Sequence, residues 1–156
     1  MKIKINNHQN QQHVNSNRTK ALTTWLINQT QKLDKSTSWG EITVILLDDR
    51  KITKINKQVF SRTKATDVIA LRYNPLPGID DCSTAELFIN VQRANLATTR
   101  NGWNSSKELA LYIAHGCDHL AGACDDSLKE YNRMRHRELR WLRKATKLGM
   151  TDSLIF

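Results

Sequence analysis

The sequence lacks any apolar run long enough to form the core of a signal peptide or to span a membrane. It also has only three cysteines, Cys82, Cys117 and Cys124, and an odd number does not suit a framework of disulfide bonds. These absences exclude a secreted disulfide-rich domain and a membrane protein. We therefore expect a cytoplasmic protein with free thiols and no membrane partner.

Proline and glycine are also scarce, with two prolines and six glycines in 156 residues. No internal repeat and no linker-like change of composition divides the chain, and 39% of the residues are hydrophobic. A chain of this length can bury a core of its own. We therefore expect one domain over residues 1–156.

Acidic residues are few, 15 against 24 Lys and Arg, which gives a formal net charge of +9. Residues 128–149 alone contain eight Lys or Arg and two Glu. An excess of this size favours a polyanionic partner such as nucleic acid, although a basic surface without a partner would have the same composition. The clustering favours the first interpretation, a face that binds phosphates.

Apolar periodicity predicts alternating strands and helices of the α+β class. The expected strands are residues 2–6, 41–48, 66–73 and 86–91, and the expected helices are residues 18–33, 50–60 and 93–99, one that begins near Ser105 and one that closes near Gly149. We expect a mixed sheet of about four strands, in which the last two are neighbours. Residues 7–17, rich in Asn and Gln, predict an exposed loop.

The most informative pattern lies on the fourth predicted helix. His115 and His119 are four residues apart, so on a helix they share one face. Gly122 follows where a helix can end in the left-handed conformation, and acidic and thiol side chains come directly after it. A catalytic zinc site needs three protein ligands and one open position. We therefore predict a metal site on this helix, with the rest of the fold as its scaffold.

The third ligand is less strongly determined than the two histidines. Asp125 lies at a suitable spacing and offers a carboxylate oxygen, which zinc accepts. Cys124 would bind a soft ion more tightly but comes one residue early, and Asp126 is a candidate N-cap for the next helix. We predict zinc on His115, His119 and Asp125; the alternatives to Asp125 are Cys124, Asp126 or no third protein ligand. Nickel, iron or manganese also bind such a ligand set.

One position inside the motif limits the chemistry. Zinc peptidases of the His-Glu-x-x-His type carry a general-base Glu after the first His, and here that residue is Gly116. Peptide hydrolysis by that mechanism is therefore disfavoured, whereas metal-assisted phosphodiester hydrolysis agrees with the basic C-terminal helix. Cys117 and Asp118 should face away from the site, Cys117 into the packing and Asp118 toward the surface.

These residues resemble the YbeY family of bacterial rRNA-maturation endoribonucleases. The family motif His-Gly-x-x-His-Leu-x-Gly-x-Asp-His is matched by His115-Gly116, His119-Leu120 and Gly122. Weaker similarities follow the family order from about Glu41 to Gly149, at Ile55-Asn56, Thr66–Ile69, Ala85–Ile89, Ser106–Leu111, Met134 with Glu138, and Leu148-Gly149.

The resemblance implies a zinc-dependent endoribonuclease that acts on single-stranded RNA. Its implied substrate is ribosomal RNA of the small ribosomal subunit, at the 3′ end of 16S rRNA, with a role in ribosome quality control. It implies metal ligands at His115 and His119, and it places Asp125 where the family has its third His. The family's Tyr-Arg pair aligns with Val59-Phe60, so the arginine expected to face the phosphate is absent there.

Other basic residues are candidates for holding the RNA. Arg62 and Lys64 follow the missing arginine in the sequence, and Arg62 is the candidate catalytic side chain, although both also suit an ordinary solvated loop. Arg133 and Arg137 of the C-terminal helix are further candidates. The alternative function is a catalytically impaired factor that binds RNA or the ribosome and keeps the metal scaffold.

Overall fold

The computed structural model describes residues 1–97 and 102–156 in full and residues 98–101 by their backbone alone. In chain order the elements are β1 (Lys2–Asn7), α1 (Ser16–Leu33), β2 (Trp39–Leu47), α2 (Asp49–Phe60), β3 (Val68–Tyr73), β4 (Ser83–Asn90), α3 (Val91–Asn101), α4 (Ser105–Leu120) and α5 (Leu128–Lys147). The predicted alternation of strands and helices is confirmed.

The strands form one mixed sheet in the order β1-β2-β4-β3. β1 pairs with β2 and β2 with β4 in parallel, whereas β3 runs antiparallel to β4. The prediction of a four-stranded mixed sheet in which the last two strands are neighbours is therefore confirmed, and so is the α+β class. β3 forms one edge of the sheet.

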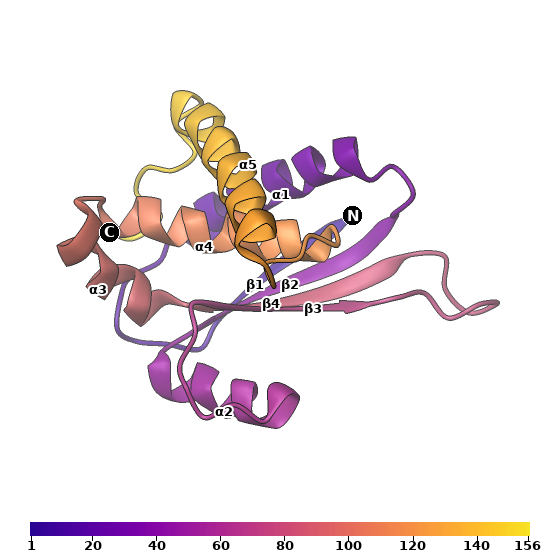
Figure 1. The fold of residues 1–156 in the computed structure, drawn as a ribbon, viewed down its shortest axis with the longest axis horizontal. Coiled ribbons are helices and arrows are strands. Elements are labelled where there is room, and N and C mark those ends of the chain that lie inside the picture. The colour runs from indigo at the N-terminus through magenta and orange to yellow at the C-terminus, as the bar shows by residue number, and fades with distance from the viewer.

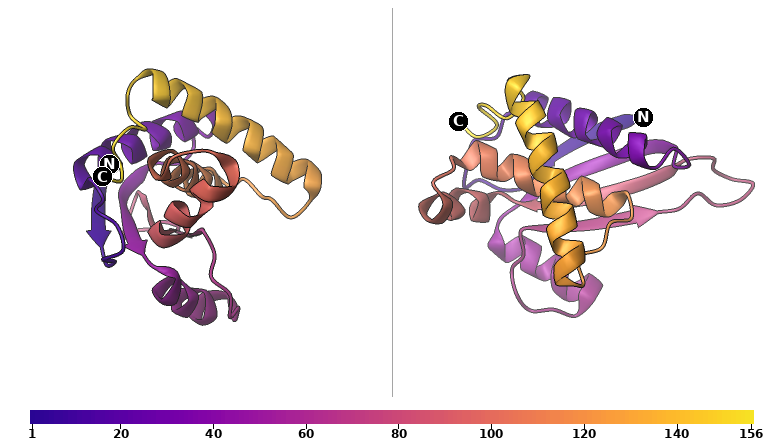
Figure 2. Two further views of the ribbon diagram at one scale, coloured as in Figure 1. Left: turned by 90° about the vertical axis from the view of Figure 1, so that its left-hand side faces the viewer. Right: turned by 45° about the horizontal axis from the view of Figure 1, so that its top comes forward.

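Helices cover both faces of the sheet, and the hydrophobic core on one face is larger than that on the other. In β2, Ile42, Val44 and Leu46 belong to the large core shared with α1, α4 and α5, while Ile45 and Leu47 belong to a smaller cluster with α2. This alternation follows from the two-residue period of a strand. Figure 1 shows α1, α4 and α5 on one side of the sheet and α2 on the other, and Figure 2 shows α5 lying across α4.

Helix α4 is the central helix of the larger layer. Leu109, Tyr112 and Ile113 share one face of the helix by their spacing, and all three are buried. Because the sheet lies beneath α4 and α5 crosses over it, the helix is fixed from two sides. No helix in the described part of the chain is both long enough and apolar enough to cross a membrane.

Gly116 brings α4 close to the sheet. A Cβ atom at this position would lie 2.9 Å from Leu87 Cδ2 and 3.0 Å from Val68 Cγ2, closer than carbon atoms pack. Packing therefore explains why this position is glycine and not the glutamate of a peptidase. Without a side chain, the helix that carries the two histidines can lie directly on β3 and β4.

The caps fix where the helices begin. Asn15 caps α1 by accepting from the Arg18 amide, so this helix begins at Ser16, two residues before the predicted start. Asn104 caps α4 by accepting from the Lys107 amide, so this helix begins at Ser105, as predicted. The exposed loop predicted for residues 7–17 is only partly right, because Gln9 is buried and its side-chain oxygen accepts two backbone amides of that loop.

Candidate metal centre

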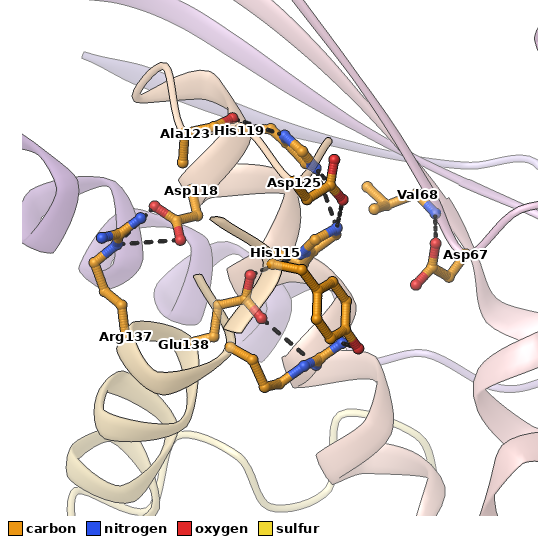
Figure 3. Close-up of polar contacts among 11 residues, drawn as sticks. Asp67, Val68, His115, Asp118, His119, Ala123, Asp125, Arg137 and Glu138 are labelled. Carbon is orange, nitrogen blue, oxygen red and sulfur yellow. Dashed lines mark hydrogen bonds and ion pairs between the residues drawn. The ribbon is translucent and has the colours of Figure 1, made fainter. Parts of the chain in front are cut away.

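The structure brings His115, His119 and Asp125 together (Figure 3). The two Nε2 atoms are 3.1 Å apart, and Asp125 Oδ2 lies 3.6 Å from Nε2 of His115 and 3.5 Å from Nε2 of His119. Zinc bonds of about 2.0–2.2 Å at tetrahedral angles place ligand atoms roughly 3.3–3.6 Å apart. The three atoms therefore form a triangle that fits one face of a tetrahedral zinc site and leaves the fourth corner open.

Each imidazole is oriented by a hydrogen bond through its other nitrogen. His115 Nδ1 donates to Glu138 Oε1 at 2.6 Å, and His119 Nδ1 donates to the Ala123 carbonyl at 3.0 Å. A carboxylate and a carbonyl only accept, so both rings are protonated at Nδ1 and present the lone pair of Nε2 to the triangle. Metal-binding histidines are held in this way in general.

Glu138 is the most unusual of these partners because it is fully buried. Its Oε2 has no hydrogen-bond partner and lies 3.5 Å from Arg135 Nη1. Burial lowers the pKa of His115, but the hydrogen bond to Glu138 and the charges of Glu138 and Asp67 outweigh it, so the pKa is raised. The buried carboxylate therefore favours a positive charge on or beside the His115 ring, whether it is a proton or a metal ion.

The turn after α4 delivers Asp125 to the histidines. α4 ends at Leu120, and Gly122 has φ of 94°, the left-handed conformation predicted for it. The Gly122 amide donates to the His119 carbonyl at 2.9 Å, which turns the chain back across the helix end. The sequence pattern therefore predicted both the end of the helix and the reversal that follows it.

The other candidates for the third ligand lie elsewhere. Cys124 Sγ donates to Asp126 at 2.7 Å, and both are exposed in a separate group with Glu130. Ser127, not Asp126, caps α5 by accepting from the Glu130 amide at 3.1 Å. Within the described residues, Asp125 is the acidic side chain that joins the two histidines in a possible metal group.

The triangle opens into a pocket of about 380 Å³ between α4, β3 and the loop after α2. Of the predicted loop cations, Arg62 lines this pocket, and its guanidinium lies 5.9 Å from the centre of the Phe60 ring. Lys64 is not among the lining residues, and its carbonyl accepts from Asn56 Nδ2 at 2.8 Å. The loop therefore offers one of its two predicted cations to the site, two residues after Phe60.

Asp67 is a pocket residue for which the sequence predicted no role at the site. It lines the pocket at the start of β3, and its Oδ1 accepts from the Val68 amide at 2.9 Å. Figure 3 shows it across the pocket from His115. The one sequence feature that pointed to Asp67 was its place in the Thr66–Ile69 segment, which resembles the family. That Asp67 lies near α4 could not be predicted, because it depends on how the strand and the helix pack.

Asp118 was predicted at the surface, and that prediction is wrong. It is 1% exposed and accepts from Arg137 Nε at 2.9 and 3.1 Å. Burial raises the pKa of Asp118, and the bond to Arg137 opposes this. Arg137 therefore holds α5 on α4. Arg133 is exposed beside Gly122 and Cys124. Neither of these two predicted RNA-binding arginines lines the metal pocket.

The fold and the site together define an α+β protein with a possible metal centre at the end of a buried helix. The family described as "Endoribonuclease YbeY" matches residues 4–146. The chain therefore belongs to this family, whose members are named as endoribonucleases, enzymes that hydrolyse internal phosphodiester bonds of RNA.

Individual relatives agree with this assignment. An endoribonuclease YbeY from Elusimicrobium minutum is 33% identical over 96 residues, covering 61% of this chain and 67% of the relative. One from Wolinella succinogenes is 30% identical over 115 residues, covering 74% of this chain and 76% of the relative. The solution structure of a Thermotoga maritima protein, 19% identical, has the same fold, with a TM-score of 0.56 over 97% of this chain and 96% of that one.

Proposed function

We propose that this chain is a zinc-dependent endoribonuclease that cleaves single-stranded ribosomal RNA in the cytoplasm. His115, His119 and Asp125 would hold the zinc ion, and the triangle of their ligand atoms is the observation that carries this proposal. Membership of the YbeY family supports the RNA substrate. We further propose maturation of the 3′ end of 16S rRNA in the small ribosomal subunit, and ribosome quality control, as the setting.

The residues around the pocket suit the hydrolysis of a phosphodiester. A zinc ion, when bound, would polarise a phosphoryl oxygen and lower the pKa of a water molecule. Glu138 and the Ala123 carbonyl hold the two imidazoles with Nε2 toward the pocket. The Arg62 guanidinium, at the same pocket, would pair with phosphate oxygens, and the Asp67 carboxylate would accept a proton during the reaction.

Cleavage of a single-stranded RNA carrying the 3′ end of 16S rRNA tests this proposal. Zinc-loaded wild-type protein should cut it, and His119→Ala should cut it at least about 100-fold more slowly, since one ligand is lost. Lys35 is exposed on the turn after α1, so Lys35→Ala is the matched control and should retain wild-type cleavage. Equal cleavage by His119→Ala and the wild type would show that the reaction does not use this site.

A second function is favoured by one observation. Phe60 stands where the family has its arginine, and it is 49% exposed at the pocket. The chain would then be a factor that binds RNA or the ribosome without cutting it. In that case RNA affinity should survive removal of the metal and fall steeply with salt, and no cleavage should exceed that of His119→Ala.

A further inference from the structure

A second concave site lies at the other end of α4. It is a groove of about 440 Å³ between the start of α4 and the C-terminal half of α5, lined by Trp103, Lys107, Leu139, Leu142, Arg143 and Lys147 among others. Lys107 and His119 are twelve residues apart on α4, so at 1.5 Å per residue the groove lies about 18 Å along the helix from the metal triangle. The groove is thus separate from the metal pocket.

The charge of the groove has one sign. Lys107, Arg143 and Lys147 line it, and no carboxylate is among the lining residues. Two other cations of α5 are paired, since Arg135 lies near Glu138 and Arg137 binds Asp118. Among the described residues, the cations that line the groove have no ion pair with an acidic side chain, so the groove carries an uncompensated positive charge. Such a surface complements a polyanion.

The groove also has an aromatic and apolar wall. The Trp103 indole is half-buried, and Lys107 Nζ lies 4.6 Å from the centre of its ring. Leu142, at the bottom, is 2% exposed. A basic groove with an aromatic side chain is the arrangement by which proteins bind single-stranded nucleic acid, since phosphates pair with the cations and a base stacks on the ring.

We propose that this groove binds a segment of the single-stranded RNA substrate, with a base against Trp103 and phosphates at Lys107, Arg143 and Lys147. The inference rests on the proposed function, because it takes RNA as the ligand. It implies that the protein holds its substrate at two places, the metal pocket and this groove, and that an RNA too short to span both binds more weakly.

Fluorescence anisotropy with a labelled oligouridine of about 12 nucleotides tests the groove, in EDTA so that binding is measured without cleavage. The groove variant is Lys107→Gln, Arg143→Gln and Lys147→Gln together. The control removes the same charge at exposed positions elsewhere, as Lys32→Gln, Lys35→Gln and Arg50→Gln. Circular dichroism and thermal unfolding establish that every variant is folded.

The groove variant should bind at least about tenfold more weakly than the control, and its slope of log affinity against log salt should be shallower by about 2, as expected for three lost phosphate contacts on a single strand. Trp103→Leu should weaken binding by about tenfold, whereas Trp103→Phe keeps a ring and should stay near the wild type.

The possible failures are distinguishable. Equal affinity and slope for the groove variant and the control would overturn the groove alone and leave the proposed cleavage untouched. Unchanged binding by Trp103→Leu would overturn the stacking of a base. Displacement of the RNA by poly-glutamate at equal charge concentration would point to an acidic protein partner instead. A wild-type protein that binds no RNA in EDTA would overturn the groove, whereas the proposed function is overturned by equal cleavage by His119→Ala and the wild type.

Discussion

One buried carboxylate determines how the first histidine is presented. Glu138 is 0% exposed and lies on α5, 23 positions after His115 in the sequence. A buried carboxylate without enough partners is costly, and Glu138 Oε2 has no hydrogen bond. A structural role alone would be served equally well by an apolar side chain, so the carboxylate is better explained by the imidazole that it orients.

Replacing Glu138 with Gln tests this explanation. The amide oxygen can still accept from His115 Nδ1, so the ring keeps its orientation, but the negative charge that favours a cation nearby is lost. We expect zinc affinity to fall about 10–100-fold, as for other outer partners of metal-bound histidine. Competition with a chromophoric chelator measures it, and Glu41→Gln, on β2 and paired with Lys4, should bind zinc like the wild type. Unchanged affinity in Glu138→Gln would contradict the role.

The turn between α1 and β2 also supports the helix that carries the site. Arg72 on β3 donates to the Leu120 carbonyl at the end of α4 and to Thr37 Oγ1 in the turn. Thr37 in turn donates to Asp34 Oδ2 at 2.6 Å. A cation at a helix C-terminus is favourable, and here it links α4 to the turn.

We predict that the stability contributed by this turn depends on pH. Hydrogen bonds from Ser36 and Thr37 lower the pKa of Asp34 from 3.8 to about 2. Because the pKa is lower in the folded protein, the ionised carboxylate adds stability above the unfolded value, and this is lost as the pH falls toward about 2. Urea unfolding between pH 7 and 2.5 should therefore show a smaller loss of stability on acidification for Asp34→Asn than for the wild type or for Asp80→Asn, an exposed control. A loss equal to that of the wild type would refute the assignment.

Gly116 determines how closely α4 approaches the sheet, and its replacement by Ala has two opposed effects. Overpacking against Leu87 and Val68 should cost about 1–3 kcal/mol, while the better helix propensity of Ala returns about 1 kcal/mol. We expect Gly116→Ala to lower the free energy of unfolding by roughly 1 kcal/mol.

A double-mutant cycle with Leu87→Ala isolates the close approach. Leu87→Ala removes the nearer contact and leaves the one with Val68, so in that background Gly116→Ala should cost less than in the wild type. Denaturant unfolding of the four proteins measures the coupling. The same cost in both backgrounds would mean that the packing of this glycine against Leu87 is not what limits the approach.

Local patterns predicted those parts of the site that lie close together in the sequence. The spacing of His115 and His119, the left-handed Gly122 and the third position at Asp125 all lie within eleven residues. The roles of Glu138 and Asp118 were not predictable, because both depend on α5 packing across α4. Asp118 is an ordinary surface residue by its sequence and becomes buried only when Arg137 covers it.

At the level of the whole molecule, the sheet order explains where the pocket forms. β3 returns antiparallel to β4 and ends the sheet on that side, so α4 and the loop after α2 meet at an open edge. Periodicity predicted the four strands and the pairing of β3 with β4, which are consecutive. It could not predict that β4 pairs with β2 over its full length, because strand order depends on contacts between distant segments.

Metal content is the most direct test of the central claim, that His115, His119 and Asp125 form one metal centre. Elemental analysis of protein purified with zinc should find about one ion per wild-type chain and almost none in Asp125→Ala or His119→Ala, because two remaining ligands bind weakly. Asp80→Ala, a remote acidic control, should retain the ion. Zinc at the wild-type level in Asp125→Ala would contradict this account and direct attention to Cys124 or Asp126 as the third ligand.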